Sequence, residues 1–326
     1  MNTLVRLAAA VVVASLAACG DDGRTADGKT RLRVGHFPNV THAQGLVAHG
    51  LSRTGKGWFE ERLGPDVAIE WFTYNAGPGA MEALLARSLD LTYVGPSPAV
   101  NAHVKSKGTD IRIISGAAKG GAALVVQGDG RIAKPEDFRG RKVATPQLGN
   151  TQDVACRAWL TSNGFKVTQT GGDVTVVPTQ NPDQLALFQK GDLDAVWTVE
   201  PWVSRLEREA KGKVLLEEKD AVTTVLVASA RFVETQPDLA KRFVKAHEEL
   251  TQWIVANPDE AHRLIREELL AETTKDMPAE LLSHCWPRLR FDTSVDAGAF
   301  DSFVRAAQAA GFLRDAGDLS RLVRAP

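Results

Sequence analysis

The chain has 326 residues, 44% of them hydrophobic and 24% charged, and its 39 basic and 40 acidic residues leave a formal net charge of -1. This is the composition of an ordinary globular protein that is long enough to fold into two compact lobes. Because no basic patch or arginine-rich tail stands out, the charge balance argues against nucleic acid as a partner.

The first residues have the pattern of a bacterial export signal. Arg6 precedes an apolar run that is too short to cross a membrane, and small residues follow it up to Leu-Ala-Ala-Cys. This ending resembles a lipobox, in which the cysteine is lipidated and becomes the new N-terminus. We expect residues 1–18 to be a signal peptide, Cys19 to carry the lipid, and the polar residues 19–30 to form a flexible tether to the membrane. The alternative is a simple signal peptide in which Cys19 is incidental.

From residue 31 onwards, strands and helices alternate. Short β-type runs are predicted at residues 31–36, 67–74, 89–94, 111–118, 122–128, 141–145, 174–178, 194–199 and 222–229. Polar turns lead from several of these runs into amphipathic helices, and residues 237–313 are mostly helical. Alternating elements of this kind predict an α/β fold with parallel sheets and helices on both faces.

The strands fall into two series that resemble each other, which indicates two lobes of related architecture. EALLARSLDLTYVGP in the first series resembles LALFQKGDLDAVWTVEP in the second, which is two residues longer. The C-terminal helices are expected to return to the first lobe. We therefore predict lobe I from residues 31–121 plus 226–326 and lobe II from residues 122–225, with a hinge at the two crossings.

Two cysteines remain after the signal, Cys156 and Cys285. They are far apart in the sequence, and each lies in a segment predicted to be helical. We expect both to be free, buried thiols.

Four segments in order behind the lipobox resemble a known family. They are RLRVGHFPNVTHAQGLVA, GPGAMEALLARSLDLTYVGPSPAV, KPEDFRGRKVATPQLGNTQD and AVWTVEPW. The chain resembles solute-binding proteins of bacterial ABC importers, in the branch that serves sulfonates, taurine, nitrate and bicarbonate, with thiamine-precursor binders related. The resemblance implies a type II periplasmic-binding-protein clamshell, a monomer that meets ABC permease subunits, no cofactor and no enzymatic activity. A sensor subunit with the same fold would look identical.

In that family the ligand lies in the cleft between the lobes, held by loops at the ends of strands and by helix N-termini. Carried over to this sequence, the candidates in lobe I are His36, Phe37, Asn39, Thr41, His42, Asn75, Ala76, Gly77, Pro96 and Ser97. The candidates in lobe II are Leu148, Gly149, Asn150, Thr151, Gln152, Glu200 and Trp202.

The polar turns around Gly77 and Gly149–Gln152 favour an anionic ligand. Unpaired N–H groups at helix N-termini carry partial positive charge, so they bind an oxyanion without a buried lysine or arginine. The resemblance leaves the ligand open. We expect a small oxyanion such as an alkanesulfonate first, then a taurine-like zwitterion, nitrate or bicarbonate, and then a thiamine-precursor pyrimidine.

Glu200 is unusual in such a site, and three roles remain open. It could pair with the amine of a zwitterion, accept hydrogen bonds from lobe I and hold the closed form, or serve as a first-turn acid of the following helix. Of the flanking tryptophans, Trp197 is predicted to lie in the core and Trp202 in the cleft.

A metal site and an enzyme are both disfavoured. His36, His42, His49 and His103 lack compact ligand spacing, and His49 is expected on the exterior of its helix. No G-x-S-x-G, H-E-x-x-H or P-loop motif occurs, so binding without chemistry is the better interpretation.

Overall fold

The computed structural model describes residues 23–169, 171–315, 317–324 and 326. The predicted signal peptide and Cys19 lie outside these residues. Within them, no helix combines the length and the apolar character needed to cross a membrane.

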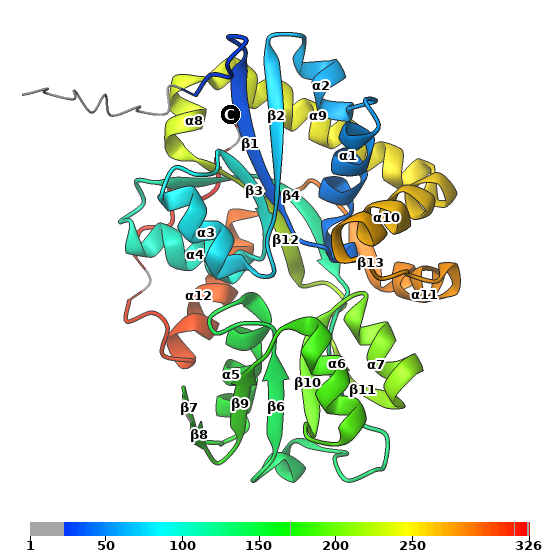
Figure 1. Cartoon of the computed structure of the whole chain (residues 1–326). Helices are drawn as coiled ribbons and strands as arrows, with labels where there is room; N and C mark the ends of the chain where they lie inside the picture. Colours follow the sequence, from blue (N-terminus) through cyan, green and yellow to red (C-terminus); the bar gives the residue numbers. More distant parts are fainter. Residues whose placement is uncertain (1–22, 170, 316, 325) are drawn as a thin grey trace, which may run out of the picture.

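Two mixed β-sheets form the two lobes (Figure 1), which confirms the predicted α/β architecture. The first has the strand order β13-β4-β12-β3-β1-β2 and the second the order β11-β5-β10-β6-β9. The first sheet contains β1 (Thr30–His36), β2 (Val67–Thr73), β3 (Leu91–Val94), β4 (Ile111–Gly120), β12 (Val222–Ser229) and β13 (Leu289–Phe291). The second contains β5 (Ala122–Gln127), β6 (Lys142–Thr145), β9 (Thr175–Pro178), β10 (Ala195–Val199) and β11 (Gly212–Glu217), and β7 (Val167–Thr168) pairs with β8 (Gly171–Gly172) beside it.

Both sheets are mixed rather than purely parallel. Each contains an antiparallel strand that follows a crossing of the chain from the other lobe: β12 in the first sheet and β5 in the second. β1 runs parallel to β2 and β3, whereas β12 is antiparallel to β3 and β4. Likewise β5 is antiparallel to both β10 and β11. The whole of β12 pairs within the first sheet, so the boundary expected between residues 225 and 226 falls inside this strand. The crossing lies before Val222 instead.

The first crossing of the chain, from the first lobe into the second, requires glycine. Gly120 and Gly121 separate β4 from β5, and both have a φ of +73°, in the left-handed region. A Cβ atom at Gly120 would also collide with the carbonyl oxygen of Arg288. The chain can therefore turn from one sheet into the other within two residues.

Alternating side chains of the strands supply a core on each face of both sheets. In β12, Leu226 and Ala228 face one core and Val225 and Val227 the other. One face of the first sheet is covered by α1 (Ala43–Arg53), α2 (Trp58–Leu63), α9 (Pro237–Ala256), α10 (Pro258–Thr273) and α11 (Ala279–Cys285). The other is covered by α3 (Gly77–Leu85), α4 (Pro96–Lys105) and α12 (Phe300–Ala309). In the second lobe, α5 (Thr151–Ser162) lies on one face, and α6 (Asn181–Lys190) and α7 (Trp202–Ala210) lie on the other.

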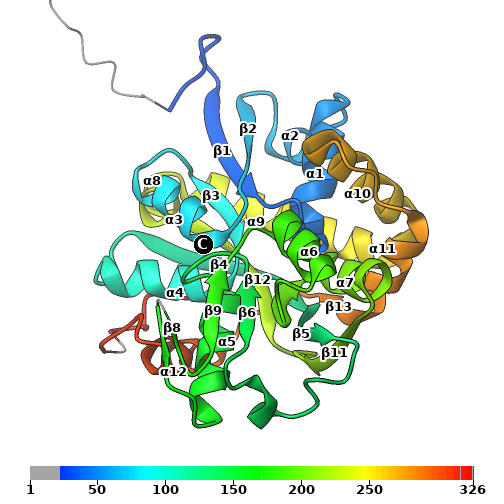
Figure 2. The same cartoon turned by 60° about the horizontal axis from the view of Figure 1, so that its bottom comes forward.

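Two C-terminal helices contact the second lobe as well as the first. α12 packs against α5, and α11 packs against α7 (Figures 1 and 2). The predicted return of the C-terminal helices to the first lobe is therefore only part of their role, because they also connect the lobes.

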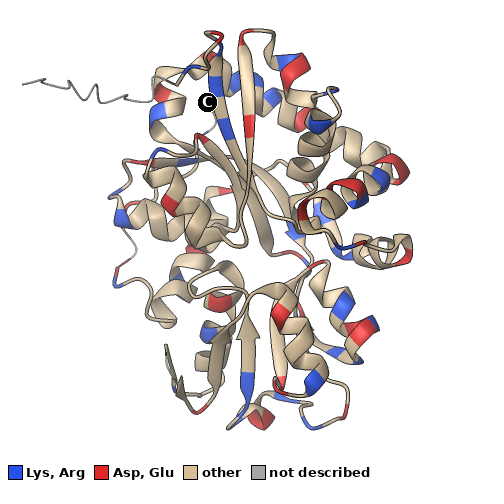
Figure 3. Cartoon of the chain, in the orientation of Figure 1, with Lys and Arg blue, Asp and Glu red and all other residues tan. Residues whose placement is uncertain are grey.

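The predictions for the core residues are confirmed. Trp197 is buried and donates its indole N–H to Glu218 at 3.0 Å. Cys156 and Cys285 are free and buried. Basic and acidic residues are interspersed along the chain in both lobes (Figure 3).

His247 of α9 is a buried polar group beneath the first sheet. Its Nε2–H donates to the carbonyl oxygen of Gly116 at 2.8 Å, and its Nδ1 accepts from the hydroxyl of Tyr93 at 3.0 Å. Burial lowers the pKa of His247 to about 4. The folded protein therefore holds this imidazole neutral in mildly acidic solution.

We expect His247 to make folding stability depend on pH between about 6.5, the pKa of an unfolded histidine, and 4. The unfolded chain binds a proton there that the folded protein does not, so stability falls as the pH decreases, by at most about 1.4 kcal/mol per pH unit. Urea unfolding from pH 4.5 to 7.5 should show a shallower dependence for His247→Gln, which keeps a donor and an acceptor. Equal slopes for variant and wild type would contradict this prediction.

Candidate functional site

Two adjoining cavities lie between the lobes, where the carboxyl ends of strands from both sheets meet. The inner cavity has a volume of about 30 Å³ and the outer one of about 280 Å³. Asn39 and Asn75 from the first lobe and Pro146 and Asn181 from the second line both of them. The two cavities are therefore parts of one cleft between the lobes.

Most predicted ligand-binding residues surround the inner cavity. They are Phe37, Asn39, Thr41, His42, Asn75, Ala76, Gly77, Asn150, Thr151 and Gln152. The cavity is also lined by residues that were not predicted from the sequence: Gly95, Pro98, Pro146, Asn181, Val199 and Thr223. Asn181 had a usable signal, because it follows β9 and begins α6 in the same way that Thr151 follows β6 and begins α5.

Helix N-termini from both lobes reach this cavity. α3 begins at Gly77 and α5 at Thr151, and the side chain of Asn150 caps α5 by accepting from the N–H of Asp153 at 2.8 Å. In the described part of the chain, the backbone N–H groups of Gly77, Thr151 and Gln152 have no hydrogen-bond partner. Two helix ends thus present free donors and partial positive charge to one small space.

His42 adds a neutral donor to this space. Burial holds the pKa of His42 well below its usual value, and the ring stacks on Phe37 with centroids 4.3 Å apart. Its Nδ1 accepts from the N–H of Phe37 at 3.4 Å, which leaves the proton on Nε2. The inner cavity therefore offers hydrogen-bond donors without a charged side chain among its lining residues.

The lobes are in direct contact around the cleft. Ser97 N–H donates to Thr151 Oγ1 at 3.3 Å, and Trp202 Nε1–H donates to Asn39 Oδ1 at 3.1 Å. The backbone N–H of Val40 also donates to the carbonyl oxygen of Glu200 at 3.2 Å. These bonds join residues of different lobes, so the structure represents the closed form of the clamshell.

Some predicted site residues do not line the inner cavity: His36, Pro96, Ser97, Leu148, Gly149, Glu200 and Trp202. Trp202 lines the outer cavity instead, and Leu148 is 39% exposed. Gly149 has a φ of +76°, in the left-handed region that favours glycine, so the turn requires glycine at this position. Its N–H donates to Asp153 at 2.9 Å and is therefore already paired. Pro96 and Ser97 form the first turn of α4.

Glu200 faces away from the cleft. It has no exposed surface, and its carboxylate accepts from Ser204 N–H at 3.0 Å, Ser204 Oγ at 2.9 Å and Arg288 Nη1 at 3.0 Å. Ser204 belongs to α7, whereas Arg288 precedes β13 of the first lobe. Glu200 precedes α7, which begins at Trp202, so it is not an acid of the first turn, although it accepts from the N–H of Ser204 in that turn. Its bond to Arg288 fits the contact that holds the closed form, and its paired carboxylate leaves no place for a ligand amine.

The outer cavity is larger, and part of its wall is apolar. Pro38, Pro182, Pro201, Trp202, Leu269 and Met277 form its apolar wall. Arg205 and Lys275 are its cations, and Glu272 is its acid. It can accept an organic tail that extends from a group held in the inner cavity.

Comparison with known proteins decides the family. The sequence profile of the NMT1-like family matches residues 25–268, which is most of the chain. The chain belongs to the NMT1-like family. The predicted relationship to sulfonate- and taurine-binding proteins is thereby confirmed at the level of the family.

Named relatives agree with this assignment. The chain is 28% identical to the taurine-binding periplasmic protein of Escherichia coli K12 over 197 residues, which are 59% of each protein. It is 27% identical to a putative aliphatic sulfonates-binding protein of Bacillus subtilis 168 over 260 residues, 77% of this chain and 74% of the relative. The match to the taurine-binding protein thus spans less than two thirds of that relative's length.

Among solved structures, the alkanesulfonate-binding protein SsuA from Xanthomonas axonopodis pv. citri, bound to MOPS, superposes with a TM-score of 0.74. The sequence identity is 17%, over 91% of this chain and 98% of the other. The likeness shows the fold, the two-lobed clamshell of periplasmic binding proteins.

Proposed function

We propose that this protein is the extracytoplasmic solute-binding component of an ABC importer and that it captures a small oxyanion, an alkanesulfonate first. The observation that carries the proposal is the inner cavity, in which the N-termini of α3 and α5 from opposite lobes present unpaired N–H groups. A sulfonate head group accepts such hydrogen bonds in several directions, and its charge matches the helix dipoles.

The outer cavity supports an organic anion over an inorganic one. Its apolar wall, which includes Trp202, Leu269 and Met277, would cover an alkyl tail. Nitrate or bicarbonate would leave that space to water. A taurine-like zwitterion is less favoured because Glu200, the acid expected to meet its amine, is paired with Arg288. A thiamine-precursor pyrimidine lacks the charge that the inner cavity accommodates.

The remaining parts of the proposal concern the context in which the protein works. We propose that Cys19 anchors the exported protein to a membrane through its lipid, that the protein is a monomer, and that its partners are permease subunits. We propose no enzymatic activity, in keeping with relatives that are named as binding proteins.

A thermal-shift screen of alkanesulfonates, taurine, nitrate, bicarbonate and pyrimidines tests the proposed ligand. A ligand at 100 times its dissociation constant adds about 2.7 kcal/mol of stability, so a true ligand is readily detected. We expect the largest shift with an alkanesulfonate. A larger shift with the pyrimidines, or no shift with any oxyanion, would contradict the proposal.

Thr151→Val tests the site itself. The substitution removes the hydroxyl that borders the inner cavity and accepts from Ser97 N–H, and it leaves that N–H unpaired in the closed form. We expect the affinity for the best ligand of the screen to fall roughly tenfold, or about 1.4 kcal/mol. Calorimetry should find no change for Thr161→Val, an exposed position in the same helix. Equal affinity in Thr151→Val and wild type would remove this helix end from the site.

A further inference from the structure

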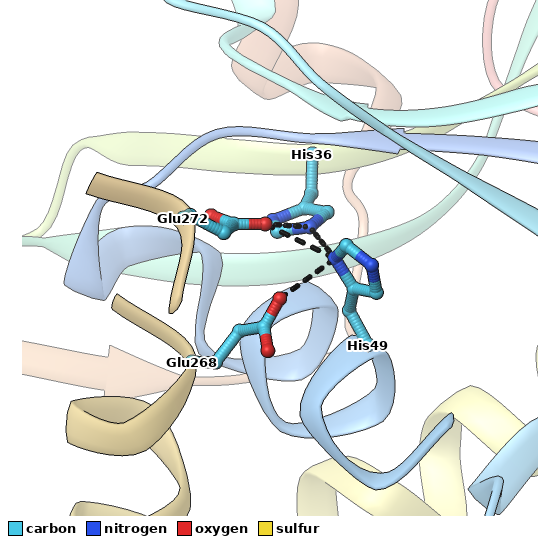
Figure 4. Close-up of side chains that lie close together, drawn as sticks. All are labelled: His36, His49, Glu268 and Glu272. Atoms are coloured by element: carbon cyan, nitrogen blue, oxygen red, sulfur yellow. Dashed lines mark hydrogen bonds and ion pairs between the residues drawn. The ribbon is translucent and has the colours of Figure 1, made fainter. Parts of the chain in front are cut away.

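Four potential metal ligands from separate parts of the first lobe meet beside the outer cavity. His36 ends β1, His49 lies in α1, and Glu268 and Glu272 lie one turn apart on α10. One ligand atom from each residue lies within 4.8 Å of the other three, and Figure 4 shows the side chains pointing toward one another. From the sequence we expected no metal site, and we expected His49 on the outside of its helix. That expectation for His49 is wrong, because only 8% of the residue is exposed.

The distances within this cluster are short. His36 Nε2 lies 3.0 Å from His49 Nδ1, and each of these nitrogens lies 3.0 Å from Glu272 Oε1. His49 Nδ1 lies 2.8 Å from Glu268 Oε1 as well. The side chains of both glutamates are at most 2% exposed. Three electronegative atoms therefore form a closed triangle, and a fourth lies next to it.

Protons alone cannot satisfy that triangle. An imidazole nitrogen either donates one proton or accepts through one lone pair, and a carboxylate oxygen only accepts. If both nitrogens carry protons, two N–H groups face each other. If one of them does not, its lone pair faces the oxygen of Glu272. In each case one contact is repulsive, whereas a cation between the atoms would bind the lone pairs of all three.

The surroundings prepare these side chains as ligands. His36 Nδ1 lies 3.3 Å from the carbonyl oxygen of its neighbour Phe37, so this nitrogen carries the proton of the neutral ring and Nε2 offers its lone pair. Thr73 Oγ1 donates to Glu272 at 2.8 Å, and Arg53 Nε donates to both oxygens of Glu268 at 3.0 Å. The second oxygen of Glu272 is buried and has no partner in the described part of the chain.

We propose that His36, His49, Glu268 and Glu272 bind one Zn²⁺ ion. Two imidazole nitrogens and two carboxylate oxygens suit tetrahedral zinc, which binds these atoms at about 2.0–2.2 Å. Tetrahedral ligands at that distance lie about 3.3–3.6 Å apart, so the three atoms of the triangle need to separate by only a few tenths of an ångström. The ion would join α10 to β1 and α1. It is a structural ion of the first lobe, separate from the anion held between the lobes.

Metal titration of the full chain tests this site without reference to the transported ligand. After treatment with EDTA, calorimetry with ZnCl₂ should show one equivalent bound with submicromolar affinity, and the melting temperature should rise. Co²⁺ should bind with the visible absorption of a tetrahedral site. Anomalous diffraction at the zinc edge should place the ion among the four side chains. The absence of saturable binding, or an ion at another position, would overturn the proposal.

Substitutions of the proposed ligands test whether these residues bind the Zn²⁺ ion. We expect His49→Gln and Glu268→Gln each to weaken Zn²⁺ binding about 100-fold or more. Glu267→Gln is the matched control, because its side chain is 59% exposed on the same helix and pairs with Arg263. Unchanged zinc affinity in both cluster variants would overturn the proposal, and so would an equal loss in the control. Since anion binding is measured separately by the thermal-shift screen, either proposal can fail without the other.

Discussion

Gly95→Ala should lower the affinity for the transported anion on the order of 100-fold, about 2.7 kcal/mol. Gly95 precedes α4 in the first lobe and faces Thr151 of the second across the inner cavity. A Cβ atom at this position would overlap Thr151 Oγ1 and lie 3.2 Å from Thr151 Cβ. The φ of Gly95 is -67°, which alanine adopts freely, so the substitution strains the closed form and not the lobe that carries it.

Two measurements separate a block of closure from a general loss of structure. Solution scattering should show wild-type protein compacting when ligand is added, whereas Gly95→Ala should stay extended at ligand concentrations that saturate the wild type. Gly79→Ala is the matched control, because its Cβ would meet only Tyr74 Cδ1 at 3.9 Å. Normal compaction and affinity in Gly95→Ala would show that the lobes need not approach this closely.

Arg288→Met should destabilise the protein by about 3 kcal/mol or more. Arg288 is the cation that reaches the buried carboxylate of Glu200, and it also lies 2.9 Å from Glu207. Removing one partner of a buried ion pair leaves the other charge uncompensated, which typically costs about 3–5 kcal/mol. Urea unfolding at neutral pH measures the loss.

The double variant Glu200→Gln, Arg288→Met should recover part of this stability, because the uncompensated charge is then absent. Arg290→Met provides the control. Its pair with Asp220 is a surface pair, with side chains 55% and 82% exposed, and such pairs contribute little. If Arg288→Met alone proves as stable as the double variant, Glu200 does not depend on Arg288 in the folded protein.

Patterns among residues that are close in the sequence were sufficient to predict the strands and helices and many of the residues that line the inner cavity. The apolar residues of β12 predict a strand whichever sheet it joins, because successive side chains point to opposite faces and fill a core on each. Asn150 caps α5 through a bond to Asp153, only three residues further on. The carboxyl ends of parallel strands gather at one edge of a sheet, so residues after β1, β2 and β6 were expected to meet in the cleft.

Patterns of neighbouring residues did not determine which of the two sheets a strand joins. β12 pairs with β3 and β4 in the first lobe, although its composition would suit either lobe. The boundary between the lobes was misplaced for that reason. Similarly, nothing within the segment around Glu200 distinguishes a carboxylate that faces the ligand from one that faces Arg288.

The tertiary structure decided every feature that depends on partners distant in the sequence. Glu200 and Arg288 are 88 positions apart, and His49 and Glu272 are 223 apart, yet each pair lies within 3.0 Å. Spacing in a sequence reveals ligands only when they share a helix face or a turn, as Glu268 and Glu272 do. Because the packing of α10 against α1 brings those two glutamates to the histidines, only the assembled first lobe brings the proposed zinc ligands together.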